Sequence, residues 1–158
     1  MLDAVTNAVG IVLEAVSQAD SVTILVAQDD DDMTSYTLPA DVAITQNNFA
    51  SNLGIHQIVP GQKVALVIDG GAVEAVDLVG GAVYTQLDGT ALVLNYADRT
   101  VLLLFADGNS VMVDTRTAEV MQMGGGWLSF LNLHDWDKLT IFGQYDDKLF
   151  RSVLIVRR

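Results

Sequence analysis

Short runs of apolar residues alternate along the whole chain with glycine, aspartate and asparagine, and many of the apolar residues are β-branched. This pattern is typical of β-strands joined by turns and not of long amphipathic helices. We therefore predict strands near residues 9–17, 21–28, 34–39, 42–46, 62–69, 72–79, 81–87, 90–96, 100–106, 109–114, 117–122, 127–132, 138–143 and 148–157.

Three glycine-containing sequences predict tight turns between neighbouring strands. Asp69-Gly70-Gly71, Asp88-Gly89 and Asp107-Gly108 each separate two apolar runs. Glycine adopts the positive φ of a hairpin turn at little cost, so each sequence predicts an antiparallel hairpin.

Two segments carry a weaker helical pattern. Residues 49–58 suggest a helical turn, with Asn47 or Asn48 as its N-cap. The apolar residues of the first sixteen positions also fit a period of 3.6, which leaves a helix open there. We favour a strand from Gly10 onward, because Gly10 opens one copy of an internal repeat.

The chain aligns with itself at a spacing of about 71–75 residues. The alignment pairs residues 10–12 with 81–83, 22–24 with 92–94, 35–38 with 110–113, and 63–68 with 138–143. Each copy then continues through a turn into a final strand. The repeat indicates that one small β-structure has been duplicated.

We therefore predict an all-β fold of two tandem small antiparallel β-barrel or β-sandwich units related by internal duplication. The expected divisions are an N-terminal extension (1–9), a first unit (10–79) and a second unit (80–158). Units of this size usually close into a barrel, because an open sheet exposes unpaired strand edges. Continuous apolar runs such as residues 101–105 predict strands that are buried on both faces.

Charge and composition narrow the classes of partner. The net charge is −12, and residues 1–79 carry most of it, with eleven acidic side chains against Lys63 alone. Nucleic acids and anionic membrane surfaces would be repelled. The chain has no cysteine, which excludes thiolate metal sites and a cysteine nucleophile. No apolar run is long enough for a membrane span, and the first residues lack the basic segment of a signal peptide.

Candidate metal and catalytic residues are few. Four consecutive aspartates offer oxygen ligands for Ca²⁺, but they lack the alternation, glycine and distal glutamate of an EF-hand, so we expect an exposed loop without tight binding. The two histidines suggest ordinary turn or edge positions, and no Gly-x-Ser-x-Gly sequence accompanies them. The triple glycine lacks the lysine of a phosphate-binding loop and is expected to be a flexible turn. These residues are Asp29, Asp30, Asp31, Asp32, His56, His134, Gly124, Gly125 and Gly126.

Four aromatic residues gather in the second unit: Trp127, Phe130, Trp136 and Tyr145. On an exposed sheet face they would stack on sugar rings or anchor a protein interface. In a small unit they would more commonly belong to the core. They are the interaction surface that the sequence offers, and we predict no catalytic, cofactor or metal site.

The turn and strand pattern of residues 10–79 resembles small tandem β-barrel repeats of bacterial cell-surface proteins that are associated with S-layers. The resemblance rests on Gly10 and Val12, residues 36–38 (Tyr-Thr-Leu), 41–45 (Asp-Val-Ala-Ile-Thr) and 60–76, which begin Pro-Gly-Gln-Lys-Val. The second copy departs from it, since Trp136-Asp137 stands before its lysine. The resemblance implies a spacer, scaffold or interaction module at the cell surface or outside the cell, and it implies no functional residues.

We therefore expect a non-catalytic structural or interaction module of a bacterial surface assembly, with no enzymatic activity and no cofactor. The excess of apolar residues predicts self-association or contact with neighbouring surface modules. The uneven charge favours head-to-tail contacts between the acidic first unit and the arginines of the second. The alternative is a carbohydrate-binding module that uses exposed aromatics of the second unit. The arginines concerned are Arg99, Arg116, Arg151, Arg157 and Arg158.

Overall fold

The structure is a computed structural model that describes the chain except for residues 1–4, 29–32, 51–52 and 81–82. The described residues form β-strands and two short 3₁₀-helices, which confirms the predicted all-β fold. The chain divides into two compact units, residues 1–83 and 84–158, which are described separately below.

The first unit is a seven-stranded sheet with the strand order β3-β2-β1-β6-β7-β4-β5. Neighbouring strands are antiparallel except for β4 and β7, which run parallel. Its elements are β1 (Val5–Ser17), β2 (Ser21–Gln28), β3 (Met33–Pro39), β4 (Ala43–Gln46), β5 (Phe49–Ala50), the 3₁₀-helix η1 (Ile55–Gln57), β6 (Lys63–Asp69) and β7 (Ala72–Leu78). The strand predicted from residue 9 therefore begins at Val5.

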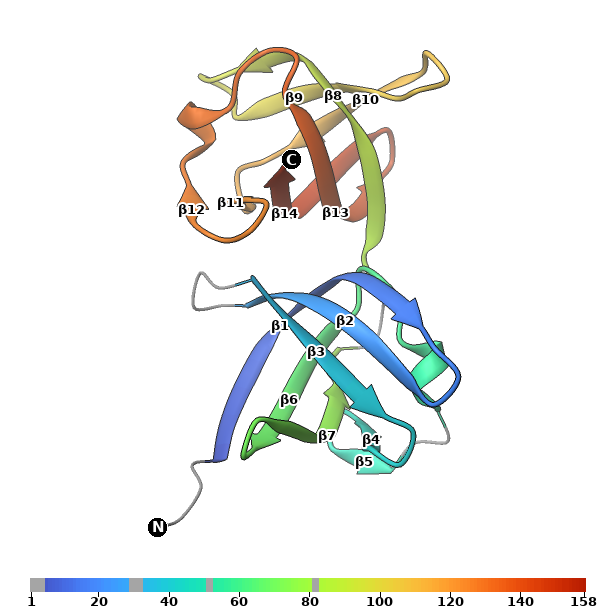
Figure 1. The fold of residues 1–158 in the computed structure, drawn as a ribbon. Helices are drawn as coiled ribbons and strands as arrows, with labels where there is room; N and C mark the ends of the chain where they lie inside the picture. Colours follow the sequence, from blue (N-terminus) through green and yellow to red (C-terminus); the bar gives the residue numbers. More distant parts are fainter. Residues whose placement is uncertain (1–4, 29–32, 51–52, 81–82) are drawn as a thin grey trace. The chain divides into compact units, whose positions relative to one another are not determined.

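The second unit has the order β10-β9-β8-β13-β14-β11-β12. An additional parallel pairing of β10 with β14 closes five of these strands into a barrel. Figure 1 shows how strongly the strands of this unit curl to make that closure. The elements are β8 (Thr85–Asn95), β9 (Thr100–Leu104), β10 (Ser110–Asp114), β11 (Glu119–Gln122), β12 (Trp127–Leu128), η2 (Phe130–Asn132), β13 (Lys138–Asp146) and β14 (Leu149–Arg157).

The two units share the same strand order, which confirms the predicted duplication. The predicted alignment is correct for residues 63–68 with 138–143 but wrong for the strands before them, and Tyr36 corresponds by register to Val113. Gly10 lies opposite Val64 in β6, and Gly89 lies opposite Leu139 in β13. Gly10 is therefore equivalent to Gly89, not to residue 81, which lies outside the described residues. Residues 92–94 belong to β8, the equivalent of β1, and so do not match residues 22–24.

The prediction of a turn at Asp88-Gly89 is also wrong, because both residues lie within strand β8. A Cβ atom on Gly89 would lie 2.5 Å from the carbonyl oxygen of Leu104, and one on Gly10 would lie 2.1 Å from that of Ala27. Each glycine lets the next strand cross closely beside a β-bulge. The glycine that suggested a turn is instead the residue at which the backbones of two neighbouring strands approach closely.

Of the other predicted turns, some are confirmed and some are not. Gly70, Gly71 and Gly108 have positive φ and lie in turns between strands, as predicted. Asn47 and Asn48 do not cap a helix, since with φ of 50° and 68° they make the turn between β4 and β5. The helical turn predicted over 49–58 is limited to η1, and the strand predicted over 127–132 is β12 followed by η2.

Each unit has its own apolar core. Alternation places Val22, Ile24 and Val26 of β2 inside the first core, and Val101 and Leu103 of β9 inside the second. Leu102 and Leu104 are only partly buried, so β9 is not fully buried on both faces as predicted. The 3₁₀-helices complete the cores at equivalent places, with Ile55 in the first unit and Phe130 in the second.

Candidate functional site

The four aromatic residues singled out from the sequence do not form one surface. Phe130 is buried, with 5% of its surface exposed, whereas Trp127 is 39%, Tyr145 is 53% and Trp136 is 68% exposed. Trp127 and Phe130 line the same pocket. Tyr145 lies elsewhere and packs edge-on against the ring of Phe150, with the centroids 5.0 Å apart.

Trp136 occupies a backbone position at which the first unit has a glycine. Its N–H donates to the carbonyl of Ala91 (2.6 Å), as the N–H of Gly61 donates to Val12 (2.8 Å) in the first unit. Both residues have positive φ, 74° for Trp136 and 89° for Gly61. A bulky side chain rarely adopts this conformation, and here the side chain gains little burial in return.

A pocket of ≈ 460 Å³ lies between the start of β11 and the segment from β12 to η2. Trp127 and Phe130 contribute aromatic rings, Arg99 and Arg116 contribute guanidinium groups, and Ser129 is part of the opposite wall. The guanidinium carbon of Arg99 lies 5.6 Å from the centroid of the Phe130 ring, a cation–π contact. Aromatic rings and hydrogen-bonding groups thus converge on one space.

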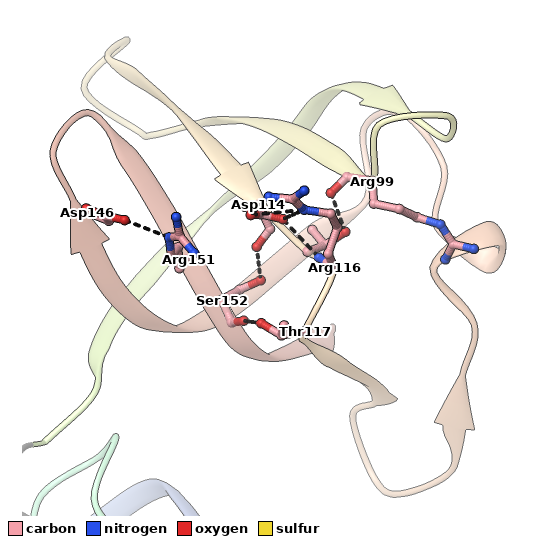
Figure 2. A network of polar contacts seen from close by, with 8 residues as sticks. Arg99, Asp114, Arg116, Thr117, Asp146, Arg151 and Ser152 are labelled. Atoms are coloured by element: carbon pink, nitrogen blue, oxygen red, sulfur yellow. Dashed lines mark hydrogen bonds and ion pairs between the residues drawn. The ribbon is translucent and has the colours of Figure 1, made fainter.

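A polar network beside this pocket joins β10 to β14 (Figure 2). Ser152 donates from Oγ to the backbone carbonyl of Asp114 at 2.7 Å, in a buried position. Arg116 donates to the Asp114 carboxylate from Nε at 3.1 Å and from Nη2 at 2.8 Å. These donations lower the pKa of the Asp114 carboxyl, against desolvation by burial, which raises it. Figure 2 shows the Arg99 side chain extending away from this network.

This network fixes one wall of the pocket. Thr115 donates from Oγ1 to the carbonyl of Arg99 at 2.7 Å, which holds the turn before β9 against the end of β10. Asp114 keeps Arg116 in a bidentate pair, so the guanidinium has a defined place although its side chain is 64% exposed. A second exposed ion pair joins Nε of Arg151 to Oδ2 of Asp146 at 2.8 Å. These two residues line another pocket together with Tyr145.

The remaining candidate metal and catalytic residues that the structure describes do not come together in one site. Asp29, Asp30, Asp31 and Asp32 lie outside the described residues. His56 and His134 are both exposed, and among the described residues no group of three or more metal-ligating side chains comes together. Gly124, Gly125 and Gly126 all have positive φ in the turn between β11 and β12.

Arg99 and Arg116 line this pocket, although the sequence did not single them out as part of a candidate binding site. Thr23 and Thr100 are equivalent by register, and Val22 and Arg99 are the residues before them. Val22 is a buried residue of β2, whereas Arg99 lies in the turn before β9 with φ of 58° and an exposed side chain.

No protein-family model matches the chain, and no curated protein is significantly similar to it. In the part of the chain that the structure describes, no helix is long and apolar enough to cross a membrane. The functional argument therefore rests on the residues themselves.

Proposed function

We propose that this chain is a non-catalytic interaction module of a bacterial cell-surface or extracellular assembly, and that it associates with copies of itself through the second unit. The observation that carries the proposal is Trp136, an indole with 68% exposure on a backbone of φ 74° where the duplicate unit has Gly61.

The position of Trp136 costs stability without an evident return inside the unit. A non-glycine residue in the left-handed region costs ~1–2 kcal/mol. The exposed indole adds apolar surface that water solvates poorly. Tryptophan at an interface is, however, among the side chains that contribute most to binding. A partner that covers Trp136 would supply the burial that the isolated unit lacks.

Two further exposed apolar side chains of the second unit lie on β8, to which the Trp136 backbone is bonded, or in the turn after it. Residues 133–136 run along the end of β8, held at one end by Trp136 and at the other by Tyr96, whose hydroxyl donates to the carbonyl of Leu133 at 2.6 Å. Val93 and Tyr96 are 54% and 42% exposed on this stretch of β8 and the turn after it. Their equivalents by register are Glu14 and Ser17.

This comparison separates what the fold needs from what it does not. The first unit forms the same strands with polar residues at these two places, so folding does not demand the apolar side chains. An apolar set that includes an exposed tryptophan marks a contact surface. The resemblance of residues 10–79 to tandem surface-protein repeats supports an assembly role outside the cell.

Light scattering at tens of micromolar tests the proposal. We expect a mass above the 17.0 kDa of one chain, and a return to that mass in the Trp136→Gly variant. Because this variant restores the glycine of the first unit, it should fold at least as stably as the parent. Phe49→Ser is the matched control, since it removes a 77% exposed aromatic of the first unit and should leave the association intact.

Two outcomes contradict the proposal. If the parent chain is a monomer in both low and moderate salt, the proposed self-association is wrong. Dissociation by Phe49→Ser but not by Trp136→Gly would place the contact elsewhere. We expect association to persist at raised salt, because Arg116 and Arg151 are already paired with Asp114 and Asp146 within their own unit.

A further inference from the structure

A second property of the second unit is independent of self-association. We infer that the pocket beside Trp127 binds a neutral pyranose ring of a polysaccharide. The pocket volume of ≈ 460 Å³ is within the range of small-molecule sites. Its lining combines an indole with guanidinium, hydroxyl and carboxylate groups, from Trp127, Phe130, Arg99, Arg116, Ser129 and Glu119.

The first unit has different residues at the places that correspond to part of this lining. Val22 and Ile55 belong to one apolar core in the first unit, with exposures of 0% and 4%. In the second unit, Phe130 takes the place of Ile55, and the Arg99 guanidinium lies over its ring at 5.6 Å. Arg99 belongs to the turn before β9, has φ of 58° and is exposed. The second unit thus places an exposed cation beside its equivalent of Ile55.

Trp127 supplies the stacking surface. It lies opposite Met121 in β11, as Ala50 lies opposite Thr45 in β4 of the first unit, so the duplicate has a small side chain at this place. Trp127 is 39% exposed and lines the pocket. The C–H face of a pyranose packs well on an aromatic ring, and Trp127 offers such a ring in the pocket wall.

The polar groups fit sugar hydroxyls. Arg116 uses Nε and Nη2 to hold Asp114, which leaves its other N–H donors for a ligand. Among the described residues, the Arg99 guanidinium makes no ion pair, so all its donors are available beside the Phe130 ring. Glu119 lines the pocket as an acceptor. Donors and an acceptor that line the same pocket suit hydroxyl groups, each of which both donates and accepts.

Charge favours a neutral sugar over an acidic one. Arg99 and Arg116 are balanced by Asp114 and Glu119, so the pocket and its supporting network carry no excess of positive charge. The chain as a whole has a net charge of −12, which would repel a polyanionic glycan. A neutral sugar ring is not repelled by the net charge of the chain and needs no excess of positive charge in the pocket.

Titration of the full chain with soluble neutral hexasaccharides tests this inference, with cellohexaose, chitohexaose and xylohexaose as probes and hexagalacturonic acid as the acidic comparison. Tryptophan fluorescence and calorimetry are the readouts. We expect at least one neutral probe to bind and to perturb the fluorescence. Trp127→Ala should abolish the binding, and Arg99→Asn, which removes the guanidinium but suits the left-handed backbone of this turn, should weaken it at least tenfold.

Trp136→Ala is the matched control, because it removes the more exposed tryptophan, which lies outside the pocket. We expect it to bind the neutral probe with unchanged affinity, whatever it does to self-association. Binding that is lost with Trp136 and kept without Trp127 would overturn the site. Preference for the acidic hexasaccharide would overturn the neutral sugar, and failure of all neutral probes to bind would overturn the inference as a whole. Circular dichroism of each variant verifies that it is folded.

Discussion

Replacing Gly89 by alanine should destabilise the second unit by more than the loss of a turn glycine would. The added Cβ would lie 2.5 Å from the carbonyl oxygen of Leu104 and 2.9 Å from Cγ of Leu103. Both distances are well inside van der Waals contact, and the oxygen belongs to a paired strand that cannot simply rotate away. Forcing atoms into such a site costs typically 1–3 kcal/mol, and we expect the upper part, about 2–3 kcal/mol.

Gly108→Ala is the comparison within the same unit. Gly108 has φ of 88°, but a Cβ there would meet no atom within 4 Å. Its replacement therefore costs only the left-handed strain of an alanine, ~1 kcal/mol. Gly89 is the opposite case, since it has no positive φ and a crowded neighbour. The two variants separate steric exclusion from backbone strain.

Urea denaturation followed by tryptophan fluorescence measures the difference. Both tryptophans of the chain, Trp127 and Trp136, lie in the second unit, so the signal reports that unit. We expect the free energy of unfolding to fall by about 2–3 kcal/mol for Gly89→Ala, with a melting temperature lower by on the order of 10–20 °C. If Gly89→Ala costs no more than Gly108→Ala, the strand does not pass through Gly89 and a turn is the better description.

Three further predictions concern the barrel closure and the acidic segment. Ser152→Ala removes the buried donor to the carbonyl of Asp114 and should lower the stability of the second unit by ~1 kcal/mol, as measured by urea denaturation. The lowered pKa of Asp114 makes its contribution to stability present at neutral pH and lost as the pH falls through that pKa, below about pH 4; Arg116→Ala should therefore raise the midpoint of acid unfolding. Calorimetry should detect no micromolar Ca²⁺ binding, and micromolar binding that Asp30→Asn with Asp32→Asn abolishes would refute the expectation of a simple exposed loop.

Local patterns determined most of the secondary structure. Alternation in residues 21–28 and 63–69 predicted β2 and β6 almost to the residue, because one face of each strand is buried and the other is not. The Asp107-Gly108 turn was predictable because the demand for positive φ is local. The duplication was also visible, since a repeated order of strands leaves a repeated order of apolar runs.

The register of the repeat was not determined locally. Glycine permits both a turn and a close approach of backbones, and only the crossing of β9 beside Gly89 decides between them. Reading that glycine as a turn split β8 into two strands and shifted the alignment of the copies. The contact of Arg99 with Phe130 likewise depends on the tertiary fold, and no local pattern indicates it.

The sequence by itself determined the class of fold, the duplication and the aromatic residues from which any site would be built. Only the tertiary structure decided that Phe130 is core, that Trp127 lines a pocket and that Trp136 stands exposed at a glycine position. The closure of the second unit through β10 and β14 was likewise decided in three dimensions. The physical reason is that strand propensity and turn preference act over a few neighbouring residues, whereas exposure and pocket lining depend on which distant strands pair.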